Sequence, residues 1–319
     1  MDYLITGGAG FIGSTLINRL AEDLNNNIFV VDDLSMGELG NIDNMEERNI
    51  NFIKASVTDS EVMEKLLVEN NFDYIFHLAA VASVADSVAR PLETHEVNFK
   101  SVLQLLELCR NYQTGLKRLV FASSAAVYGD EPTLPKQEES IIRPLTPYAV
   151  DKFAAERYVL NHYSLYGVPT SAVRFFNVYG PNQNPNSPYS GVLSILTDRF
   201  QKMIDQHESQ FTVFGDGEQT RDFIFVEDVV DALLLVSKSE SSLGNVYNVG
   251  TGTATSLNDV ITLYKKIIEV DIPVVYTEAR EGDIPRSFAD NRRLVDLGFI
   301  PKYTIESGIQ TYLESVLKK

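Results

Sequence analysis

The stretch Thr6-Gly7-Gly8-Ala9-Gly10-Phe11-Ile12-Gly13 lies near the start of a chain of 319 residues. Directly before it, residues 3–5 form a short apolar run that is typical of a buried parallel strand. Directly after it, residues 14–20 carry apolar side chains at helical spacing (Leu16, Ile17, Leu20). A strand, a glycine turn and a helix thus follow one another in the order that a dinucleotide-binding fold requires.

The three spaced glycines have separate physical roles. Gly7 permits the tight turn, Gly10 lets the backbone approach a pyrophosphate, and Gly13 lets the helix pack closely on the strand. The helix N-terminus at Phe11 and Ile12 then directs free N–H groups and a positive dipole end at the phosphates. A glycine pattern alone is also compatible with a plain structural loop, so a second feature is needed.

That second feature is an acidic residue at the end of the next strand. Residues 28–31 are predicted to form this strand, and Asp32 follows nineteen residues after Gly13. A carboxylate there accepts both ribose hydroxyls of an adenosine and repels a 2′-phosphate. No Lys or Arg lies between Asp32 and Arg48. The cofactor is therefore predicted to be NAD rather than NADP.

Composition narrows the class of protein. Hydrophobic residues make up 44% of the chain and charged residues 22%, as in ordinary soluble globular proteins. The net charge of −17 argues against a nucleic acid or an anionic membrane as partner. The single cysteine, Cys109, excludes an internal disulfide and is expected to be a buried structural thiol. We expect a cytoplasmic protein without a membrane span, a signal peptide or a metal site.

Strand and helix patterns alternate through the first half of the chain. Further strands are predicted at residues 51–55, 73–78, 117–124 and 170–177, and helices at 59–68, 92–110 and 147–166. This alternation predicts an α/β fold, a doubly wound parallel sheet of the Rossmann type. We expect an NAD-binding domain at residues 1–179 and a smaller α/β substrate domain at 180–319. A segment near 222–250 is expected to return to the first domain.

Residues with catalytic potential follow the fifth strand. Ser124 ends this strand, and Tyr148 and Lys152 are spaced to share one face of the next long helix. An ammonium and the positive nicotinamide of NAD⁺ are expected to lower the pKa of Tyr148, which makes its phenol a usable base. Ser124 can bond the reacting hydroxyl and relay its proton. His77 is a second candidate base, although a His in an apolar strand is more often a hydrogen-bonded core residue.

These motifs resemble the extended short-chain dehydrogenase/reductase family over nearly the whole chain. Within it, the chain is most similar to nucleotide-sugar 4-epimerases of the UDP-galactose and UDP-N-acetylglucosamine (UDP-GlcNAc) type. The similarity rests on four further segments: Phe121-Ala122-Ser123-Ser124-Ala125-Ala126-Val127-Tyr128-Gly129, Arg174-Phe175-Phe176-Asn177-Val178-Tyr179-Gly180, Arg221-Asp222-Phe223-Ile224-Phe225-Val226 and Arg280-Glu281-Gly282-Asp283.

The resemblance implies a wider set of site residues. Besides the glycine stretch, Asp32, Tyr148 and Lys152, the residues implied to contact NAD are Asp33, Ser56, Val57, Leu78, Ala79, Ala80 and Asn98. The residues implied to contact a UDP-sugar are Ser83, Ser123, Ser124, Asn177, Val192, Leu193, Thr212, Phe214, Arg221, Arg280, Asp283 and Ser287. Arg221 and Arg280 would supply the local positive charge that a diphosphate needs on an acidic protein.

The resemblance also implies a reaction and an assembly. Tyr148 removes the proton of the 4-hydroxyl while C4 gives its hydride to NAD⁺, and the 4-keto sugar rotates and takes the hydride back on its other face. In this family two helices of each subunit form a dimer contact, here those at 92–110 and 147–166. We therefore expect a homodimer.

Ser287 bears on which sugar is used. It aligns with a position where strict UDP-galactose/UDP-glucose epimerases carry a bulky Tyr. A large side chain there would collide with a 2-acetamido group during rotation, since overpacking costs typically ~1–3 kcal/mol. We therefore expect turnover of UDP-GlcNAc and UDP-GalNAc, with UDP-glucose and UDP-galactose as a second pair.

Related activities remain open. Dehydratases and decarboxylases carry an extra acid where this chain has Ala125-Ala126, which argues against both. A 4-keto nucleotide-sugar reductase uses the same Ser, Tyr and Lys, and a UDP-glucuronate 4-epimerase is compatible with Ser287. A non-catalytic NAD-binding regulator is a remote alternative, because such proteins typically lose the Tyr or the Lys.

Overall fold

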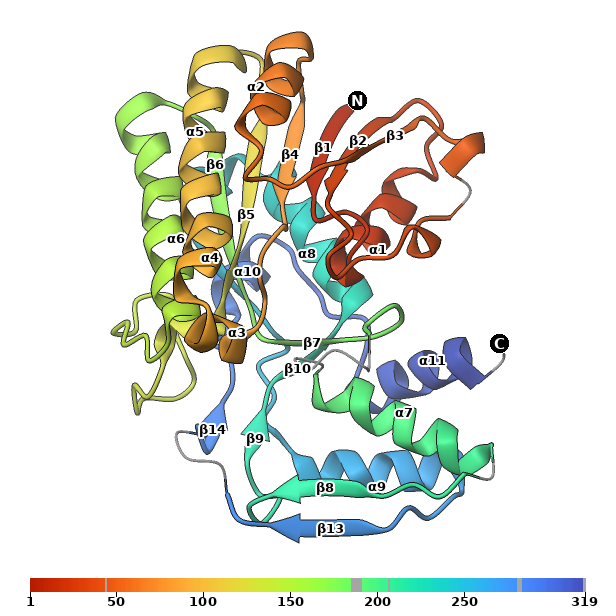
Figure 1. The fold of residues 1–319 in the computed structure, drawn as a ribbon. Coiled ribbons are helices and arrows are strands. Elements are labelled where there is room, and N and C mark those ends of the chain that lie inside the picture. Colours follow the sequence, from red (N-terminus) through yellow and green to blue (C-terminus); the bar gives the residue numbers. More distant parts are fainter. Residues whose placement is uncertain (44, 185–190, 206, 280–282, 318–319) are drawn as a thin grey trace.

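A computed structural model describes residues 1–43, 45–184, 191–205, 207–279 and 283–317. Within these residues the central element is a parallel sheet of seven strands in the order β11-β6-β5-β4-β1-β2-β3 (Figure 1). Its strands are β1 (Asp2–Thr6), β2 (Asn27–Asp32), β3 (Ile50–Lys54), β4 (Tyr74–His77), β5 (Arg118–Ser124), β6 (Thr170–Phe175) and β11 (Val246–Val249). The strand order reverses beside β1, which confirms the predicted doubly wound Rossmann-type fold.

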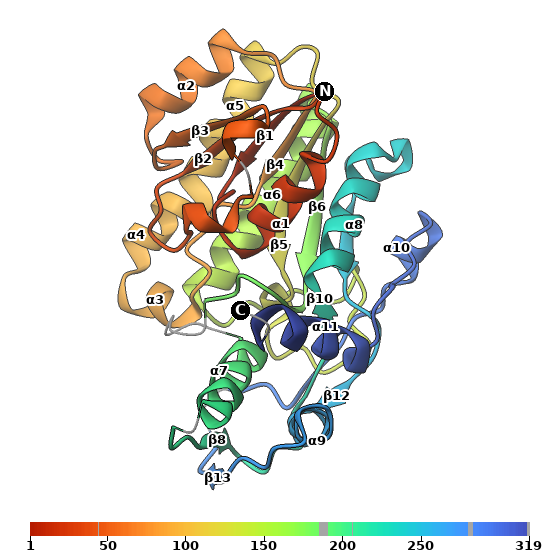
Figure 2. The ribbon, with the colours of Figure 1, turned by 90° about the vertical axis from the view of Figure 1, so that its right-hand side faces the viewer.

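Helices cover both faces of the sheet, which forms the middle of three layers (Figure 2). α1 (Phe11–Leu20) and α8 (Val226–Lys238) pack on one face. The other face carries α2 (Ser60–Glu69), α5 (Ser101–Tyr112) and α6 (Pro147–Tyr166). Because both faces are buried, the strands are apolar on both sides rather than alternating. Cys109 lies buried within α5, as expected of a structural thiol.

The limits of α6 follow from its capping residues. The Thr146 hydroxyl accepts a hydrogen bond from the backbone N–H of Ala149 at 3.3 Å, and Pro147 occupies the first turn. Gly167 ends the helix in a left-handed conformation with φ of 73°. The helix therefore spans the predicted residues 147–166 and carries Tyr148 and Lys152 in its first turns.

The predicted helix at residues 92–110 is not regular. α4 (Pro91–His95) continues into a π-helical turn (Glu96–Lys100) before α5 begins at Ser101. The extra residue of a π-turn changes which side chains face inward, and such turns are frequent at functional sites. The apolar periodicity of the sequence does not reveal this turn, which contains Asn98.

The predicted strand at residues 170–177 is divided in two. The N–H of Asn177 bonds the Asp222 carbonyl at 3.0 Å, so the chain leaves the main sheet after β6. β7 (Asn177–Tyr179) then pairs in parallel with β10 (Phe223–Phe225). This change of partner places β7, whose first residue Asn177 is exposed, below the carboxyl end of the sheet (Figure 1).

The remaining elements lie mostly beyond this edge, around a separate apolar core (Figure 1). They are α7 (Val192–Ile204), β8 (Phe211–Phe214), β9 (Thr220–Arg221), β12 (Thr255–Ser256), α9 (Leu257–Ile268), β13 (Val274–Thr277), β14 (Arg286–Ser287) and α11 (Ile305–Leu317). Two short helices, α3 (Val84–Ala89) and α10 (Arg292–Asp296), accompany the main sheet. α8 and β11, within residues 226–249, belong to the main sheet layers. The domain limits at 179/180 stay a prediction.

Short 3-10 turns connect several elements, at Leu39–Asn41, Met45–Glu47, Ala125–Tyr128 and Glu240–Ser242. In the part of the chain that the structure describes, no helix combines the length and the apolar character needed to cross a bilayer.

Candidate active site

The glycine turn between β1 and α1 is sterically closed to larger residues. Gly7 has a φ of +70°, and a Cβ on it would lie 2.7 Å from the backbone nitrogen of Ala79. A Cβ on Gly13 would lie 2.3 Å from the carbonyl oxygen of Gly7. The turn therefore brings the start of α1 against the end of β1, the close packing that the sequence predicts for this pair.

The N-terminus of α1 is built to receive an anion. Gly10 occupies the N-cap position and supplies no side chain, and the first turn contains no acidic residue. The first N–H groups of a helix have no partner within the helix, so they are available to a phosphate. Phe11 and Ile12 lie half-buried in this first turn. The glycine cradle and the bare helix end thus fit the pyrophosphate of a dinucleotide.

Asp32 lies at the end of β2 and is bound to this turn. Its Oδ2 accepts from the N–H of Ala9 at 3.0 Å, and its Oδ1 accepts from the N–H of Leu34 at 2.8 Å. Burial raises the pKa of Asp32, while these hydrogen bonds act in the opposite direction. The neighbouring Asp33 accepts from the N–H of Ser35 at 2.9 Å. The structure thus brings Asp32 to the glycine turn, where a ribose would lie.

The loop after β4 lies directly beside the same turn. The hydroxyl of Thr6 accepts a hydrogen bond from the N–H of Ala79 at 3.3 Å and bonds Nδ1 of His77 at 2.9 Å. His77 is buried, and burial lowers its pKa to about 3, so the imidazole is neutral at physiological pH. A buried, neutral imidazole fits the expectation that His77 is a hydrogen-bonded core residue rather than a catalytic base. Leu78, Ala79 and Ala80 are half-buried around this contact.

Three further residues predicted to contact the cofactor differ in how their side chains are used. Beyond β3, Ser56 is half-buried and bonds Thr58, while Val57 is buried in the core. Asn98 is 1% exposed, and its amide accepts from the N–H of Val81 at 2.8 Å and donates to the Val81 carbonyl at 3.0 Å. Asn98 therefore holds the loop after β4 through its side chain.

Ser124, Tyr148 and Lys152 converge at the carboxyl end of β5. Ser124 ends β5, and its hydroxyl accepts from the N–H of Ala126 at 3.2 Å. Tyr148 is 9% exposed and lies beside Ser124, whose hydroxyl acts to lower the pKa of the phenol. Lys152 is buried one turn further along α6 and donates to the Ala122 carbonyl at 2.8 Å. One helix and one strand end thus present a hydroxyl, a phenol and an amine together.

Burial dominates the electrostatics of this group. Burial raises the pKa of Tyr148, and the hydrogen bond to Ser124 acts in the opposite direction. Burial also lowers the pKa of Lys152 to about 7, against the charge of Asp151. In the protein by itself, desolvation outweighs the effect of Ser124 on the phenol, whereas the predicted lowering of the pKa also includes the positive charge of NAD⁺ and stays a prediction. The charge of a bound nicotinamide would act to lower this pKa.

Two serines predicted to face the sugar are bonded within the protein. Ser123 is 3% exposed and donates to Glu156 on α6 at 2.7 Å. Ser83 is also 3% exposed, and its hydroxyl accepts from the N–H of Asp86 as the N-cap of α3 at 2.7 Å. Neighbouring strand residues face opposite sides, so Ser123 and Ser124 cannot share one environment. Their predicted contacts with the sugar remain untested.

The residues predicted for the diphosphate and the sugar meet between β9 and β14. These strands are parallel, and Ser287 lies directly opposite Arg221. Arg221 is half-buried and donates through Nη2 to Oδ1 of Asp283 at 2.7 Å. Ser287 is also half-buried. Arg280 lies outside the described residues.

The predicted uridine contacts come from α7 and β8. In β8, Thr212 and Phe214 are half-buried on one face, while the alternate residues enter the core. Val192 and Leu193 open α7, whose N-cap Gly191 supplies no side chain. Leu193 is 1% exposed within the core, so its predicted contact with the uridine stays a prediction.

Sequence analysis gave no separate role to Asp222, which organises this region. Its carboxylate accepts from the N–H and the hydroxyl of Thr251 at 2.8 and 2.7 Å, and from the N–H groups of Gly252 and Ala289 at 2.9 and 3.1 Å. Asp222 is fully buried next to Arg221. A carboxylate directly before an apolar strand (Phe223-Ile224-Phe225) is the sequence signal for such a role.

Comparison with known proteins agrees with this geometry. Residues 3–250 match the NAD dependent epimerase/dehydratase family. A UDP-glucose 4-epimerase of Mycolicibacterium smegmatis is 36% identical over 98% of each chain.

Solved structures are similar over the whole chain. A UDP-N-acetylglucosamine 4-epimerase of Methanobrevibacter ruminantium, in complex with UDP-N-acetylmuramic acid, has a TM-score of 0.91 at 35% identity, covering 99% and 98% of the two chains. A UDP-glucose 4-epimerase of Thermotoga maritima with UDP-glucose has a TM-score of 0.91 at 36% identity, covering 100% and 99%. A UDP-glucuronic acid 4-epimerase of Bacillus cereus with its substrate and NAD has a TM-score of 0.88 at 26% identity, covering 100% and 99%.

The family match covers most of the chain, and these relatives span its full length. The site combines a dinucleotide cradle with a serine, a tyrosine and a lysine at the sheet edge. The chain therefore belongs to the NAD-dependent epimerase/dehydratase family of extended short-chain dehydrogenases/reductases, as an enzyme of the nucleotide-sugar 4-epimerase type that uses NAD.

Proposed function

We propose that this enzyme interconverts UDP-GlcNAc and UDP-GalNAc, with UDP-glucose and UDP-galactose as a second substrate pair. The observation that carries the choice of sugar is Ser287, a small side chain held opposite Arg221 on the neighbouring strand. If Arg221 binds the diphosphate, then Ser287 borders the space next to it and leaves room for a 2-acetamido group. Similarity to the Methanobrevibacter enzyme supports the N-acetylated pair, and similarity to the Thermotoga enzyme supports the second.

The residues at the sheet edge have complementary tasks in this reaction. Tyr148 takes the proton of the 4-hydroxyl, and Ser124, which lies beside Tyr148, holds the same oxygen as C4 becomes a carbonyl. NAD, when bound, supplies the hydride acceptor, with its pyrophosphate on the α1 N-terminus and a ribose at Asp32. Once the keto sugar has turned, C4 would take the hydride back on its opposite face, and Tyr148 would return the proton to the C4 oxygen, which completes the inversion.

The test of this function follows three sugars in one assay. Purified protein is incubated with UDP-GlcNAc, UDP-glucose and UDP-glucuronate without added NAD, and the products are followed by NMR. UDP-GalNAc formed from UDP-GlcNAc supports the proposal. Turnover of UDP-glucose alone retains the mechanism and refutes the substrate, whereas a need for NADH or NADPH to consume a 4-keto sugar indicates a reductase.

A single substitution at Ser287 tests the choice of sugar. Ser287→Tyr is expected to abolish most turnover of UDP-GlcNAc while UDP-glucose is still converted, because only the acetamido group needs the space. UDP-glucose serves as the matched control within the same protein. Full activity of the variant on UDP-GlcNAc would refute the role of Ser287.

A UDP-glucuronate 4-epimerase is the second candidate, favoured by the similarity to the Bacillus cereus enzyme over the whole chain. A carboxylate at C5 needs a cation or several N–H donors near the sugar. UDP-glucuronate in the same assay decides between the two.

We also infer that the enzyme acts in the cytoplasm as a homodimer. A cavity of about 420 Å³ between α4 and the start of α6 is lined by apolar side chains, among them Leu92, 81% exposed, and Val150, 48% exposed. Exposed apolar residues on neighbouring helices are typical of a subunit contact. These are the two helical regions that the family resemblance assigns to the dimer.

A further inference from the structure

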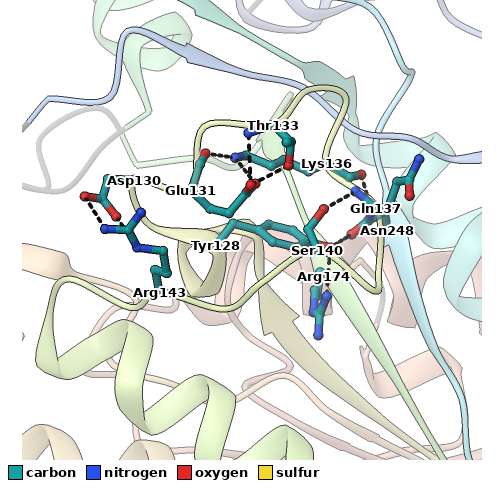
Figure 3. A network of polar contacts seen from close by, with 10 residues as sticks. All are labelled: Tyr128, Asp130, Glu131, Thr133, Lys136, Gln137, Ser140, Arg143, Arg174 and Asn248. Carbon is teal, nitrogen blue, oxygen red and sulfur yellow. Dashed lines mark hydrogen bonds and ion pairs between the residues drawn. The ribbon is translucent and has the colours of Figure 1, made fainter.

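A network of buried polar groups connects the catalytic helix to the strand that carries Ser287, and Figure 3 shows its middle part, from Arg174 through Tyr128 to Asn248. The network starts at Glu156, which lies one turn after Lys152 on α6 and is fully buried. The Glu156 carboxylate accepts from Nε and Nη2 of Arg174 at 2.9 and 2.6 Å. It also accepts from Ser123, the residue before Ser124. The first link therefore joins α6, β5 and β6 directly behind the catalytic group.

Tyr128 continues this chain away from the sheet. Its hydroxyl accepts from Nη1 of Arg174 at 2.8 Å and donates to Oδ1 of Asn248 at 2.6 Å. Tyr128 is 1% exposed, so it does not face solvent. Burial raises the pKa of Tyr128 to about 12, so its hydroxyl keeps the proton that it donates. The Tyr128 hydroxyl thus links the Glu156–Arg174 ion pair to the side-chain amide of Asn248.

Asn248 passes the connection to the segment that carries Ser287. Its Nδ2 donates to the carbonyls of Lys136 at 2.8 Å and Asp290 at 3.2 Å. The backbone of Lys136 in turn accepts from the N–H of Asp290 at 2.7 Å and donates to the Phe288 carbonyl at 2.9 Å. Phe288 follows Ser287 directly, so the position of β14 depends on this chain of bonds.

We propose that Tyr128 is a positioning residue for sugar selectivity, because its hydroxyl fixes the Ser287 strand relative to Ser124, Tyr148 and Lys152. The inference rests on the proposed function. The strand that carries Ser287 lies at the end of a continuous buried hydrogen-bond network, which holds this strand in one place. A small shift of the strand changes the space next to the hexose. Tyr128 acts through Asn248, at a distance from the sugar.

The test is Tyr128→Phe, which keeps the ring and its packing against the Arg174 guanidinium, 4.9 Å from the ring centroid. The variant loses both bonds of the hydroxyl, and the one that leads to Ser287 is the neutral bond to Asn248, worth about 1 kcal/mol, or about fivefold. We expect the ratio of kcat/KM for UDP-GlcNAc over UDP-glucose to change about fivefold through KM. kcat and the amount of bound NAD should stay unchanged, because the Glu156–Arg174 pair remains.

Tyr247→Phe is the matched control. Tyr247 precedes Asn248 on β11 and is 3% exposed. Its hydroxyl donates to the Ser241 carbonyl at 3.2 Å, a bond that is not part of the network through Tyr128. The Tyr247→Phe variant should leave the ratio of kcat/KM for UDP-GlcNAc over UDP-glucose unchanged. Asn248→Ser cuts the next link and should reproduce the Tyr128→Phe shift. The double variant should shift the ratio no further, since links in series are not additive.

The outcomes separate this inference from the proposed function. Equal loss of activity on both sugars, a change confined to kcat, or an additive double variant would overturn the positioning role while the wild-type enzyme still epimerises. Wild-type protein that converts neither sugar refutes the proposed function and the inference together.

Discussion

Tyr148 lies beside Ser124 at the end of β5, and this pair carries the acid–base part of the proposed reaction. Tyr148→Phe removes the proton acceptor and leaves the ring in place. We expect kcat to fall by about 10²- to 10⁴-fold, the usual contribution of a positioned acid–base group, without loss of bound NAD. Measurement of UDP-sugar interconversion by NMR checks this.

Tyr158→Phe is the control for that prediction. Tyr158 lies on the same helix, is 44% exposed, and packs against the Phe99 ring through its own ring, which the variant retains. Its activity should match the wild type. Wild-type turnover by Tyr148→Phe would exclude the phenol as the base.

Lys152 makes stability depend on pH. Burial lowers its pKa from 10.5 to about 7 in the folded protein. Between these values the unfolded chain binds more protons, so Lys152 destabilises the fold fully below pH ~7 and ever less as the pH rises toward ~10.5. Lys152→Met removes this penalty. Its gain in free energy of unfolding over wild type should be largest near pH ~7 and should shrink near pH ~9.5.

Urea unfolding of both proteins at the two pH values measures that difference. Comparison with the variant cancels the titration of every other group. A gain that is equal at both pH values would contradict a desolvated lysine in the folded protein.

At the scale of elements, the junction of β1 and α1 tolerates no added atom. A Cβ on Gly13 would meet the Gly7 carbonyl oxygen at 2.3 Å, and backbone on both sides cannot yield as a flexible side chain would. Gly13→Ala should therefore lower the free energy of unfolding by about 1–3 kcal/mol and weaken NAD binding. Denaturant unfolding and NAD titration measure both effects.

Gly115→Ala is the matched control, because a Cβ at Gly115 would have no neighbour within 4 Å. It should leave NAD binding unchanged. Normal NAD affinity in Gly13→Ala would show that the turn can open without cost.

At the scale of the whole molecule, the predicted homodimer depends on the apolar cavity beside α4 and α6. Adding charges through Leu92→Glu and Val150→Glu should convert a dimer into a monomer, since burial of an unpaired carboxylate is costly. Light scattering after gel filtration measures the mass. Leu24→Glu, at a position 67% exposed outside this cavity, should leave the mass unchanged. A wild-type monomer would contradict the prediction.

Local patterns in the sequence determined the main sheet, the limits of α6 and the cofactor. A glycine turn between a strand and a helix, and an acid at the next strand end, each act within about thirty residues, the length of one βαβ unit. Thr146, Pro147 and Gly167 likewise set the ends of α6 through their own backbone preferences. Each of these features depends on residues close together in the sequence, so the sequence by itself was sufficient to predict them.

Tertiary structure alone decided the features that depend on contacts between distant segments. Asn98 sits in a π-turn and binds Val81, β7 leaves the sheet to pair with β10, and Tyr128 bonds Asn248, 120 residues away. The direction of the Tyr148 pKa shift also required the fold, because burial outweighs the opposing effect of Ser124. Desolvation and long-range hydrogen bonds depend on what surrounds a side chain, and spacing along the sequence does not contain that information.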